Sequence, residues 1–240
     1  MDLPQQIFRT YDIRGIVGED LNEAIVEQIG LGLGTLLASE GSTTVVVGHD
    51  IRSSSAPFAA SVRDGLLKSG LDVIEIGQVA TPLLYWAVQH LGADGGVMIT
   101  GSHNPVEYNG LKITRGVMPI WGEELQELRK IAIGSCAVDT PGQASCSDVL
   151  GPYIENRARR FQLPEGIKVA IDCGNGTAGP VAIPLFERLG IEVDALYPEP
   201  DGTFPNHLPD PEVPRYMKKL CEMVSEGDYA CGFGFDGDSD

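Results

Sequence analysis

The stretch Thr100-Gly101-Ser102-His103-Asn104-Pro105 ends an apolar run, Gly96–Ile99, and presents a serine hydroxyl in a polar turn. Far downstream, Asp236-Gly237-Asp238-Ser239-Asp240 places three carboxylates at i, i+2 and i+4. Carboxylate oxygens are hard ligands that suit Mg²⁺. A serine, a metal ion and a cation such as Lys112 are the components of phosphoryl transfer, in which positioning and charge neutralisation supply most of the catalysis.

Outward from this loop, short β-branched runs alternate with amphipathic stretches, a pattern that predicts layered α/β structure. We expect helices over residues 22–39, 56–69, 82–91, 122–133, 149–161, 180–189 and 213–225. We expect strands over residues 43–47, 72–76, 96–99, 111–114, 168–172, 192–197 and 229–235. Residues 134–147 are small and polar and contain Pro141-Gly142, which predicts a linker. Two domains follow from this, residues 1–147 and 148–240.

The composition is acidic, with a formal net charge of −17, and 42% of the 240 residues are hydrophobic. A chain of this length can hold one large or two ordinary domains. Nucleic acid and anionic membranes are disfavoured as partners, because both repel a polyanion. A local basic pocket can still bind a sugar phosphate. The candidates for it are Arg9, Arg14, Arg52, His103 and Lys112, and the alternative is that most of them are solvated surface charges.

The five cysteines are odd in number and include no C-x-x-C pair. This pattern favours reduced thiols in a cytoplasmic protein over a disulfide framework or a zinc site. Residues 1–6 lack the basic start and apolar core of a secretion signal. No apolar run reaches the roughly 20 residues that a membrane span needs. We therefore expect a cytoplasmic protein.

The three aspartates at residues 236–240 follow an apolar run with the character of a strand. In an extended segment they would point to one side and converge on one cation. The same D-x-D-x-D spacing also opens an EF-hand calcium loop. An EF-hand needs a preceding helix, Gly at its sixth position and Glu at its twelfth. Because a strand is expected before Asp236, magnesium binding is the better interpretation.

A second motif, Gly174-Asn175-Gly176-Thr177-Ala178-Gly179, has the G-x-G-x-x-G form and follows the expected strand 168–172. Asp194 lies 20 residues after Gly174. Together they support an alternative, a Rossmann-type dinucleotide-binding oxidoreductase using Gly174, Gly176 and Gly179. That alternative would leave the serine and aspartate loops unexplained. A tight turn from strand to helix is the simpler reason for these glycines.

Several segments resemble motifs of the α-D-phosphohexomutases, the family of phosphoglucomutases and phosphomannomutases. The serine and aspartate loops are two of them. The others are Phe8-Arg9-Thr10-Tyr11-Asp12-Ile13-Arg14-Gly15, Val47-Gly48-His49-Asp50-Ile51-Arg52-Ser53-Ser54, Thr81-Pro82, Tyr108-Asn109-Gly110-Leu111-Lys112-Ile113 and Pro200-Asp201-Gly202-Thr203-Phe204-Pro205-Asn206-His207. The motifs occur in the family's order. The resemblance implies two consecutive three-layer α/β/α domains with mixed sheets.

The resemblance also implies roles for individual residues. Ser102 would be the phosphorylated catalytic serine, Lys112 the general acid/base, and His103 and Arg14 further catalytic residues. Tyr11, Arg14 and Lys112 would bind the substrate. Mg²⁺ would be held by Asp236, Asp238 and Asp240 with a phosphoserine oxygen of Ser102.

Each of these residues also has a purely structural interpretation. Ser102 could cap a turn before Asn104-Pro105, and a lone histidine such as His103 is more often structural than catalytic. Lys112 could be an ordinary lysine at a strand edge. Tyr11 and Arg14 could belong to a turn and a surface ion pair.

The expected reaction is reversible movement of phosphate between O1 and O6 of a hexose through a hexose 1,6-bisphosphate. The expected partners are glucose or mannose 1- or 6-phosphate and that bisphosphate. Members of the family have four domains and chains roughly twice as long. Residues 213–217 depart from the family pattern, so no role is assigned to them. We expect the 240 residues by themselves to fold but not to catalyse.

Overall fold

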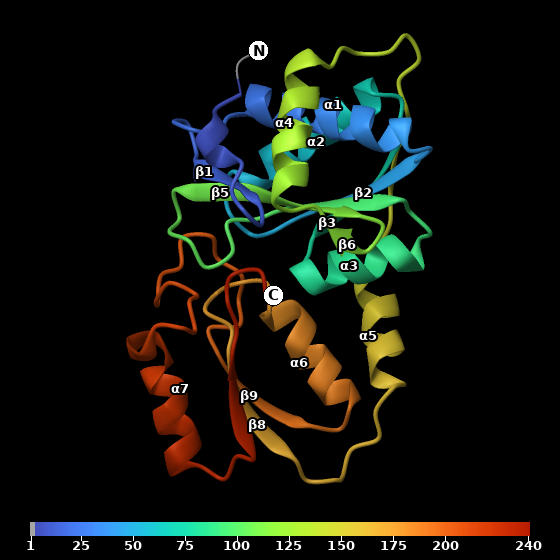
Figure 1. Ribbon diagram of the computed structural model, residues 1–240. Helices are drawn as coiled ribbons and strands as arrows, with labels where there is room; N and C mark the ends of the chain where they lie inside the picture. The colour runs from blue at the N-terminus through green and yellow to red at the C-terminus, as the bar shows by residue number, and fades with distance from the viewer. Residues whose placement is uncertain (1–2) are drawn as a thin grey trace. The chain divides into compact units, whose positions relative to one another are not determined.

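The computed structural model describes residues 3–240 and divides into two compact units. The first unit comprises the chain up to Gly101 together with Glu107–Ser147. The second comprises Ser102–Val106 together with Asp148–Asp240. Figure 1 labels their helices and strands. Both units are α/β/α domains, which confirms the expected fold class.

The first unit is built on a seven-stranded mixed sheet. In spatial order its strands are β1 (Ile13–Ile16), β5 (Tyr108–Arg115), β4 (Gly95–Ile99), β2 (Thr44–His49), β3 (Asp72–Gln78) and β7 (Ala144–Cys146), and β6 (Met118–Pro119) pairs with β5. Strands β4, β2, β3 and β7 run parallel, whereas β1 and β6 are antiparallel to β5, and β5 is antiparallel to β4. A short 3-10 helix, η1 (Gln5–Ile7), precedes β1.

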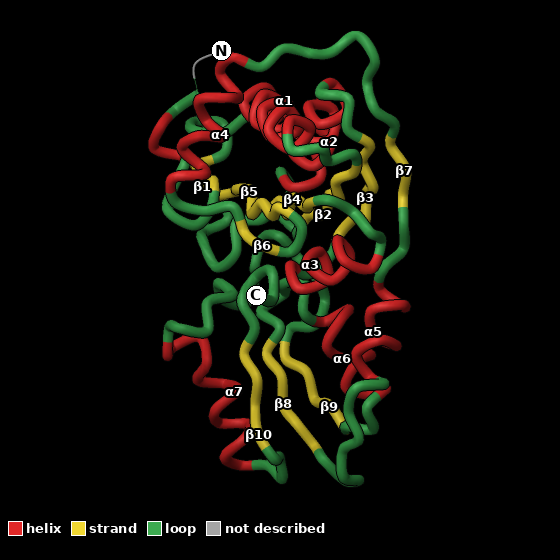
Figure 2. Tube along the Cα trace, turned by 45° about the vertical axis from the view of Figure 1, so that its right-hand side comes forward, coloured by secondary structure: helices red, strands yellow, loops and turns green. Residues whose placement is uncertain are grey.

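Helices cover both faces of this sheet, as Figure 2 shows. On one face lie α1 (Glu23–Ser39), α2 (Ser55–Lys68) and α4 (Glu123–Gly134), and α3 (Thr81–His90) lies on the other. Helix α1 begins where Asn22 accepts a hydrogen bond from the Ile25 amide at 3.0 Å, the usual way to cap a helix. Helix α3 begins with a proline in its first turn, where a missing N–H does no harm.

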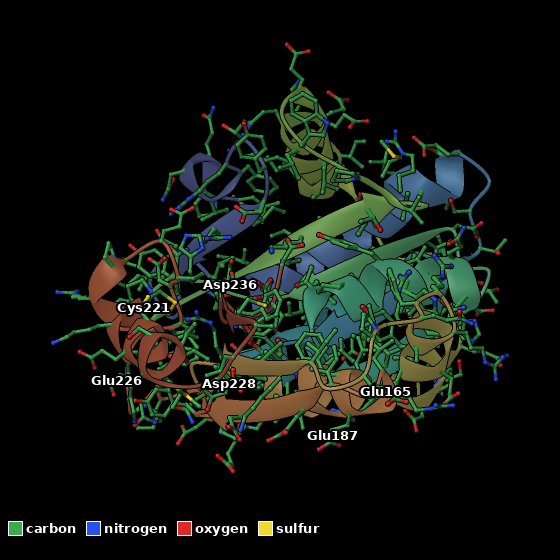
Figure 3. The ribbon with its side chains drawn as sticks, turned by 90° about the horizontal axis from the view of Figure 1, so that it is seen from below. Glu165, Glu187, Cys221, Glu226, Asp228 and Asp236 are labelled. Atoms are coloured by element: carbon green, nitrogen blue, oxygen red, sulfur yellow. The ribbon has the colours of Figure 1, made fainter. Side chains whose placement is uncertain are left out.

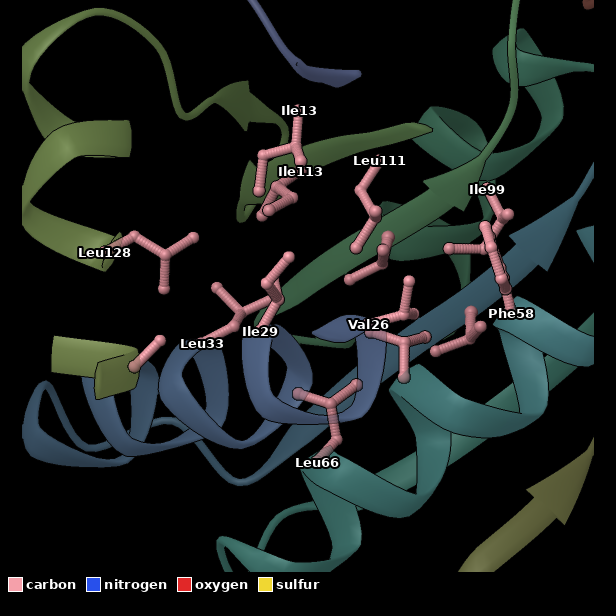
Figure 4. Close-up of a cluster of buried hydrophobic side chains, with 14 of the residues drawn as sticks. Ile13, Val26, Ile29, Leu33, Phe58, Leu66, Ile99, Leu111, Ile113 and Leu128 are labelled. Carbon is pink, nitrogen blue, oxygen red and sulfur yellow. The ribbon is translucent and has the colours of Figure 1, made fainter. Parts of the chain in front are cut away.

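The main core lies between the sheet and helices α1, α2 and α4. Figure 4 shows side chains from all of these elements meeting there, among them Ile13, Ile29, Leu33, Phe58, Leu111 and Leu128. Helices α1 and α2 approach each other at glycines. A Cβ on Gly65 would lie 2.1 Å from the Glu27 carbonyl oxygen, and one on Gly30 would lie 2.5 Å from that of Val62. The contact between these helices therefore requires glycine on both of them.

The second unit has a three-stranded sheet in the order β10 (Cys231–Gly234), β8 (Lys168–Asp172) and β9 (Glu192–Leu196). All three strands are parallel. Its helices are α5 (Leu150–Ala158), α6 (Gly179–Arg188) and α7 (Pro214–Glu226). Val169 and Ile171 pack toward α6, whereas Gly232 lies within reach of Leu220 on α7. Since alternate residues of a strand face opposite sides, α6 and α7 cover opposite faces.

The expected helices and strands are present, and the structure adds η1 and β6 and differs in further places. Strand β1 was not predicted, and β5 is longer than the expected strand at 111–114. The segment 134–147, predicted as a linker, contains β7, which pairs with β3. Its backbone also donates to the end of α2, from Val138 to the Lys68 carbonyl at 2.9 Å and from Gly142 to the Leu67 carbonyl at 2.9 Å. Within residues 3–240 no helix is long and apolar enough to cross a membrane.

The cysteines provide a test of the second core. Cys173 is buried there, and burial, together with the Asp172 and Glu199 carboxylates, raises the pKa of its thiol to about 12. Cys136, Cys146, Cys221 and Cys231 are exposed. We expect a chromogenic disulfide reagent at pH 8 to modify these four thiols rapidly and Cys173 only after denaturation.

The same shift gives a pH dependence. The folded thiol keeps its proton while the unfolded thiol loses it above pH about 8.5, so stability should decrease as the pH rises beyond that value. Cys173→Ala should lose part of this decrease between pH 8.5 and 11 in thermal melts. Rapid labelling of all five thiols in the native protein would contradict the burial of Cys173.

Candidate functional site

Ser102 is the first residue of the segment Ser102–Val106, which belongs to the second unit. It is buried, at 5% exposure. Its φ of 50° lies in the left-handed region, which is unusual for a residue with a side chain. The Oγ donates a hydrogen bond to Asp236 Oδ2 at 2.6 Å. His103, half-exposed, places Nδ1 3.3 Å from the same Oγ and 3.9 Å from Asp236 Oδ2. The structure thus brings Ser102, His103 and Asp236 together.

Residues 236–240 form a turn that follows strand β10. The Ser239 amide donates to the Asp236 carbonyl at 3.2 Å, and Ser239 has a φ of 61°. The backbone N–H of Asp240 donates to Asp236 Oδ1 at 3.1 Å. The extended geometry expected for this segment is therefore wrong, because the chain folds back around the Asp236 carboxylate. A strand before the turn, in place of a helix, also excludes an EF-hand.

Asp236 and Asp238 are two buried carboxylates in one short turn. Burial, and next the charge of Asp238, raises the pKa of Asp236 to about 7. Figure 3 shows Asp236 within the fold, whereas Glu165, Glu187, Glu226 and Asp228 lie at the periphery of the same unit. Asp236 and Asp238 are thus set apart from the solvated acidic surface that accounts for most of the negative charge.

The predicted metal ligands are not gathered as a ligand set in this structure. Over residues 3–240, no group of three or more His, Cys, Asp or Glu side chains is close enough to hold a metal ion. The chemistry of the donors nevertheless suits Mg²⁺, because two buried carboxylates and a hydroxyl are hard oxygen donors. A divalent cation would also offset the burial of the Asp236 charge and its repulsion by Asp238, which together raise the pKa of Asp236.

The glycine-rich turn at residues 174–179 supports this aspartate loop. Thr177 donates from its amide to the Gly237 carbonyl at 3.0 Å, and its hydroxyl lies 3.0 Å from Ser239 Oγ. A Cβ on Gly176 would lie 2.8 Å from the Gly237 carbonyl oxygen. A Cβ on Gly237 would in turn lie 2.5 Å from the Ser102 carbonyl oxygen. The turn, the aspartate loop and Ser102 are packed backbone against backbone.

This packing removes support from the dinucleotide alternative. Gly174 packs against Pro209, and a Cβ on Gly179 would lie 1.9 Å from the Pro198 carbonyl oxygen. The glycines of this turn are therefore packed against the protein's own loops. Asp194, the expected ribose ligand, pairs with Lys168 and Tyr229. The glycines serve close packing.

Asp172 and His207 contribute to the site without having been predicted to do so. His207 Nε2 lies 3.1 Å from the fully buried Asp172 carboxylate, and Nδ1 lies 2.8 Å from the Leu208 carbonyl oxygen. The Gly174 amide also donates to Asp172, at 2.9 Å. The pair thus ties the proline-rich loop to the end of β8 beside the glycine turn. The sequence placed His207 in a block that resembles the family and Asp172 at the end of a strand, but it gave neither residue a role in the site.

Arg14 and Lys112 share one face of the first sheet. Arg14 pairs with Gly110 and Ile13 with Leu111 in the β1–β5 ladder. Since residues directly opposite each other share a face and alternate residues return to it, Lys112 lies on the Arg14 side and Leu111 on the core side. Arg14 forms an ion pair with Asp12 and is buried, so it is not the surface pair considered from the sequence.

Three other predicted residues have distinct environments. Tyr11 is 76% exposed and stacks on Trp121 at 6.5 Å between ring centroids. Arg9 is exposed. Arg52, considered as part of a basic pocket or as a solvated charge, is buried and paired with Asp50 at 3.3 Å. Its burial shows that the interpretation as a solvated surface charge is wrong, and its pairing with Asp50 gives the basic-pocket interpretation no support.

Comparison with known proteins finds matches over nearly the whole chain. The family model for phosphoglucomutase/phosphomannomutase alpha/beta/alpha domain I matches residues 5–133, and that for domain II matches residues 152–240. A phosphoglucomutase of Neisseria meningitidis is 40% identical over 241 residues, which cover 100% of this chain and 52% of the relative. A phosphomannomutase/phosphoglucomutase of Pseudomonas aeruginosa is 40% identical over 238 residues, which cover 99% of this chain and 51% of the relative.

A solved structure shows the same architecture. A phosphoglucomutase/phosphomannomutase family protein from Burkholderia thailandensis superposes with a TM-score of 0.93 at 36% identity, over 99% of this chain and 54% of that one. The chain spans about half the length of the curated relatives it matches.

The contact between Gly237 and Ser102 gives a stability prediction. In Gly237→Ala the new methyl would meet the Ser102 carbonyl, and overpacking of this kind costs about 1–3 kcal/mol. Gly151→Ala is the matched control, because its Cβ would meet nothing within 4 Å in helix α5. Thermal melts should show a lower Tm for Gly237→Ala and an equal or higher Tm for Gly151→Ala. Equal melting of both variants would contradict the described packing.

Proposed function

Because the chain belongs to the phosphoglucomutase/phosphomannomutase family, we propose that it carries the phosphoserine and the metal loop of an enzyme that moves phosphate between O1 and O6 of a hexose. The observation that carries the proposal is the buried Ser102 hydroxyl held 2.6 Å from Asp236, next to a second buried carboxylate, Asp238. A phosphate on Ser102 would bring about −1.5 to −2 further charges to these carboxylates. Such a cluster requires a cation.

The proposed reaction has two phosphoryl transfers. In the first, the bond between phosphorus and Ser102 Oγ breaks and a bond to the free O6 or O1 of a hexose monophosphate forms, which gives a hexose 1,6-bisphosphate. The intermediate then turns around. In the second, Ser102 Oγ takes the other phosphoryl group and releases the isomeric monophosphate. Enzymes named phosphoglucomutase and phosphomannomutase/phosphoglucomutase among the relatives support this isomerase assignment.

The metal ion in this proposal is Mg²⁺, with Ser102, Asp236, Asp238 and Asp240 as the residues that would hold it. When bound, it would offset the negative charge on the transferring phosphoryl group. The Ser102 hydroxyl and the backbone N–H of Asp240 each donate a hydrogen bond to the Asp236 carboxylate.

The remaining candidate residues have roles assigned by family resemblance. Lys112 would accept the proton of the attacking sugar hydroxyl and return it in the reverse direction. Arg14, on the same sheet face, would be a further catalytic and substrate-binding residue. Tyr11 is exposed and stacks on Trp121, and by the family resemblance it would bind the substrate. His103 lies beside the hydroxyl of Ser102 and could hydrogen-bond the phosphate.

The partners in this proposal are small molecules. They are glucose or mannose 1- or 6-phosphate and the hexose 1,6-bisphosphate, in keeping with the names of the relatives. The charge of −17 disfavours nucleic acid and anionic membranes as further partners. A cytoplasmic location is part of the proposal, supported by five cysteines that are all free thiols. Residues 1–147 would be the phosphoserine domain and residues 148–240 the metal-loop domain.

Phosphorylation of Ser102 tests the proposal directly. With Mg²⁺ and excess glucose 1,6-bisphosphate, we expect the chain to gain one phosphoryl group slowly, detected by intact mass and located on Ser102 by peptide sequencing. Ser102→Ala should gain none, while Ser145→Ala, on the exposed strand β7, should behave as the parent. A phosphoryl group that still appears in Ser102→Ala, or no transfer after prolonged incubation, would refute Ser102 as the carrier.

Turnover is a separate prediction. We expect the 240 residues alone to give no measurable conversion of glucose 1-phosphate to glucose 6-phosphate, even with bisphosphate present. In-line positioning of substrate can supply effective molarities of about 10⁵ M or more, and the relatives use about twice this length to provide it. A coupled dehydrogenase assay measures the conversion. Turnover at rates typical of enzymes, about 1 s⁻¹ or more, would contradict this expectation without affecting the role of Ser102.

A further inference from the structure

Asp50 lies in the connection between β2 and α2 and is almost completely buried. Its carboxylate collects several donors. Oδ2 accepts from the amide of Gly101 at 3.1 Å, and Oδ1 accepts from the amide of Arg52 at 3.0 Å and from the hydroxyl of Ser55. Gly101 is the residue immediately before Ser102. Asp50 therefore fixes the chain at the entry to the serine loop.

Arg52 extends the same cluster to the other end of the loop. Its Nε lies 3.3 Å from Asp50 Oδ2, and its Nη1 donates to the carbonyl of Tyr108 at 3.0 Å. The guanidinium also lies against the backbone at the loop entry, since a Cβ on Gly101 would lie 2.4 Å from Arg52 Cζ. A planar group with several fixed donors suits two contacts in different directions, which an ammonium group cannot reproduce.

Asn109 adds a third connection. Its Nδ2 donates to Ser54 Oγ at 2.8 Å and to Ser55 Oγ at 2.9 Å. Asn109 is fully buried, directly after Tyr108 at the start of β5. Both flanks of the serine loop, Gly101 on one side and Tyr108-Asn109 on the other, are therefore bonded to the one short segment 50–55.

We propose that Asp50, Arg52, Ser54, Ser55 and Asn109 form a brace that holds the serine loop in the conformation required for phosphoryl transfer. In this role Asp50 and Arg52 are positioning residues, acting through the backbone of Gly101 and Tyr108. The link to catalysis rests on the proposed function of Ser102. The mechanical claim, that the brace sets the geometry of Ser102, stands by itself.

The backbone of Ser102 shows what the brace is needed for. A left-handed φ is unfavourable for a residue with a side chain and persists only where the surroundings enforce it. The brace fixes the peptide on the N-terminal side of Ser102 through the Gly101 amide. With the far flank also fixed, the loop loses the freedom to relax to an ordinary turn. Removing a brace contact should therefore release Ser102 while leaving the sheet intact.

Arg52→Lys is the variant that tests the brace. Lysine keeps the charge that neutralises Asp50, so the fold should survive. It cannot maintain the contacts to Asp50 and Tyr108 together, so the brace should be weakened. Arg63→Lys is the matched control, because Arg63 also bridges two carboxylates, Asp64 and Glu75, on α2 and β3 away from the loop. Hydrogen exchange measured by mass spectrometry should show roughly tenfold faster exchange of residues 100–109 in Arg52→Lys. Peptides from β2 and β3 should exchange as in the parent.

A phosphorus signal reports the position of residue 102 itself. Phosphoserine can be placed at position 102 during translation, so no enzymatic activity is needed. In the presence of Mg²⁺ we expect one sharp ³¹P resonance for the parent and for Arg63→Lys. Arg52→Lys should give a shifted resonance that is broadened or split, because the phosphoserine samples several positions. A change in general stability would not alter the ³¹P signal in this way at temperatures well below Tm.

Ser54→Ala provides a second variant with little risk to folding, because Ser54 is only half-buried and loses one bond to Asn109. It should produce the same effects as Arg52→Lys, but smaller. Unchanged loop exchange and an unchanged ³¹P resonance in both variants would overturn the brace, as would faster exchange throughout the unit. Failure of Ser102 to accept phosphate from the bisphosphate would instead refute the proposed function and leave the brace untouched.

Discussion

The hydrogen bond from Ser102 to Asp236 joins residues 134 positions apart in the chain and determines what the rest of the second unit must provide. A serine hydroxyl can lie against a buried carboxylate only if both loops are held close and rigid. The glycine turn at residues 174–179 supports one loop from behind, and the proline-rich loop, tied down by Asp172 and His207, packs over that turn. The bond also places a hydroxyl where negative charge is concentrated. In the proposed function, a phosphate on this hydroxyl would therefore need a cation beside it.

The helices and most strands could be predicted from the sequence because their signals are local. Helix α1 illustrates this, since its apolar period and the cap at Asn22 fix both its face and its start. Strand β1 could not be predicted, because Arg14 and Gly15 break its pattern and only pairing with β5 makes it extended. The strand β7 could not be predicted for a similar reason, because the segment around it is polar. It becomes a strand through hydrogen bonds to β3 and to the end of α2.

The candidate site was predictable in composition but not in shape. Ser102 and Asp236 were singled out by residue type and family pattern, and the structure brings them together. The turn at residues 236–240 was missed because its geometry depends on the packing of Gly237 against Ser102 and Thr177, and spacing alone contains no trace of such contacts. Arg52 was misjudged for a related reason. A charged residue in a motif was taken for a ligand or a surface group, whereas its partner is the buried Asp50.

Strand β7 has a consequence for how the protein behaves among other copies of itself. Without it, β3 would present the open edge of a parallel sheet, a row of unpaired amides and carbonyls of the kind on which chains aggregate. Strand β7 has only three residues, which are exposed and small or polar. It covers the edge of β3 but is too short to pair well with a strand of another chain. A segment whose composition is that of a linker thus protects the first unit against edge-to-edge association.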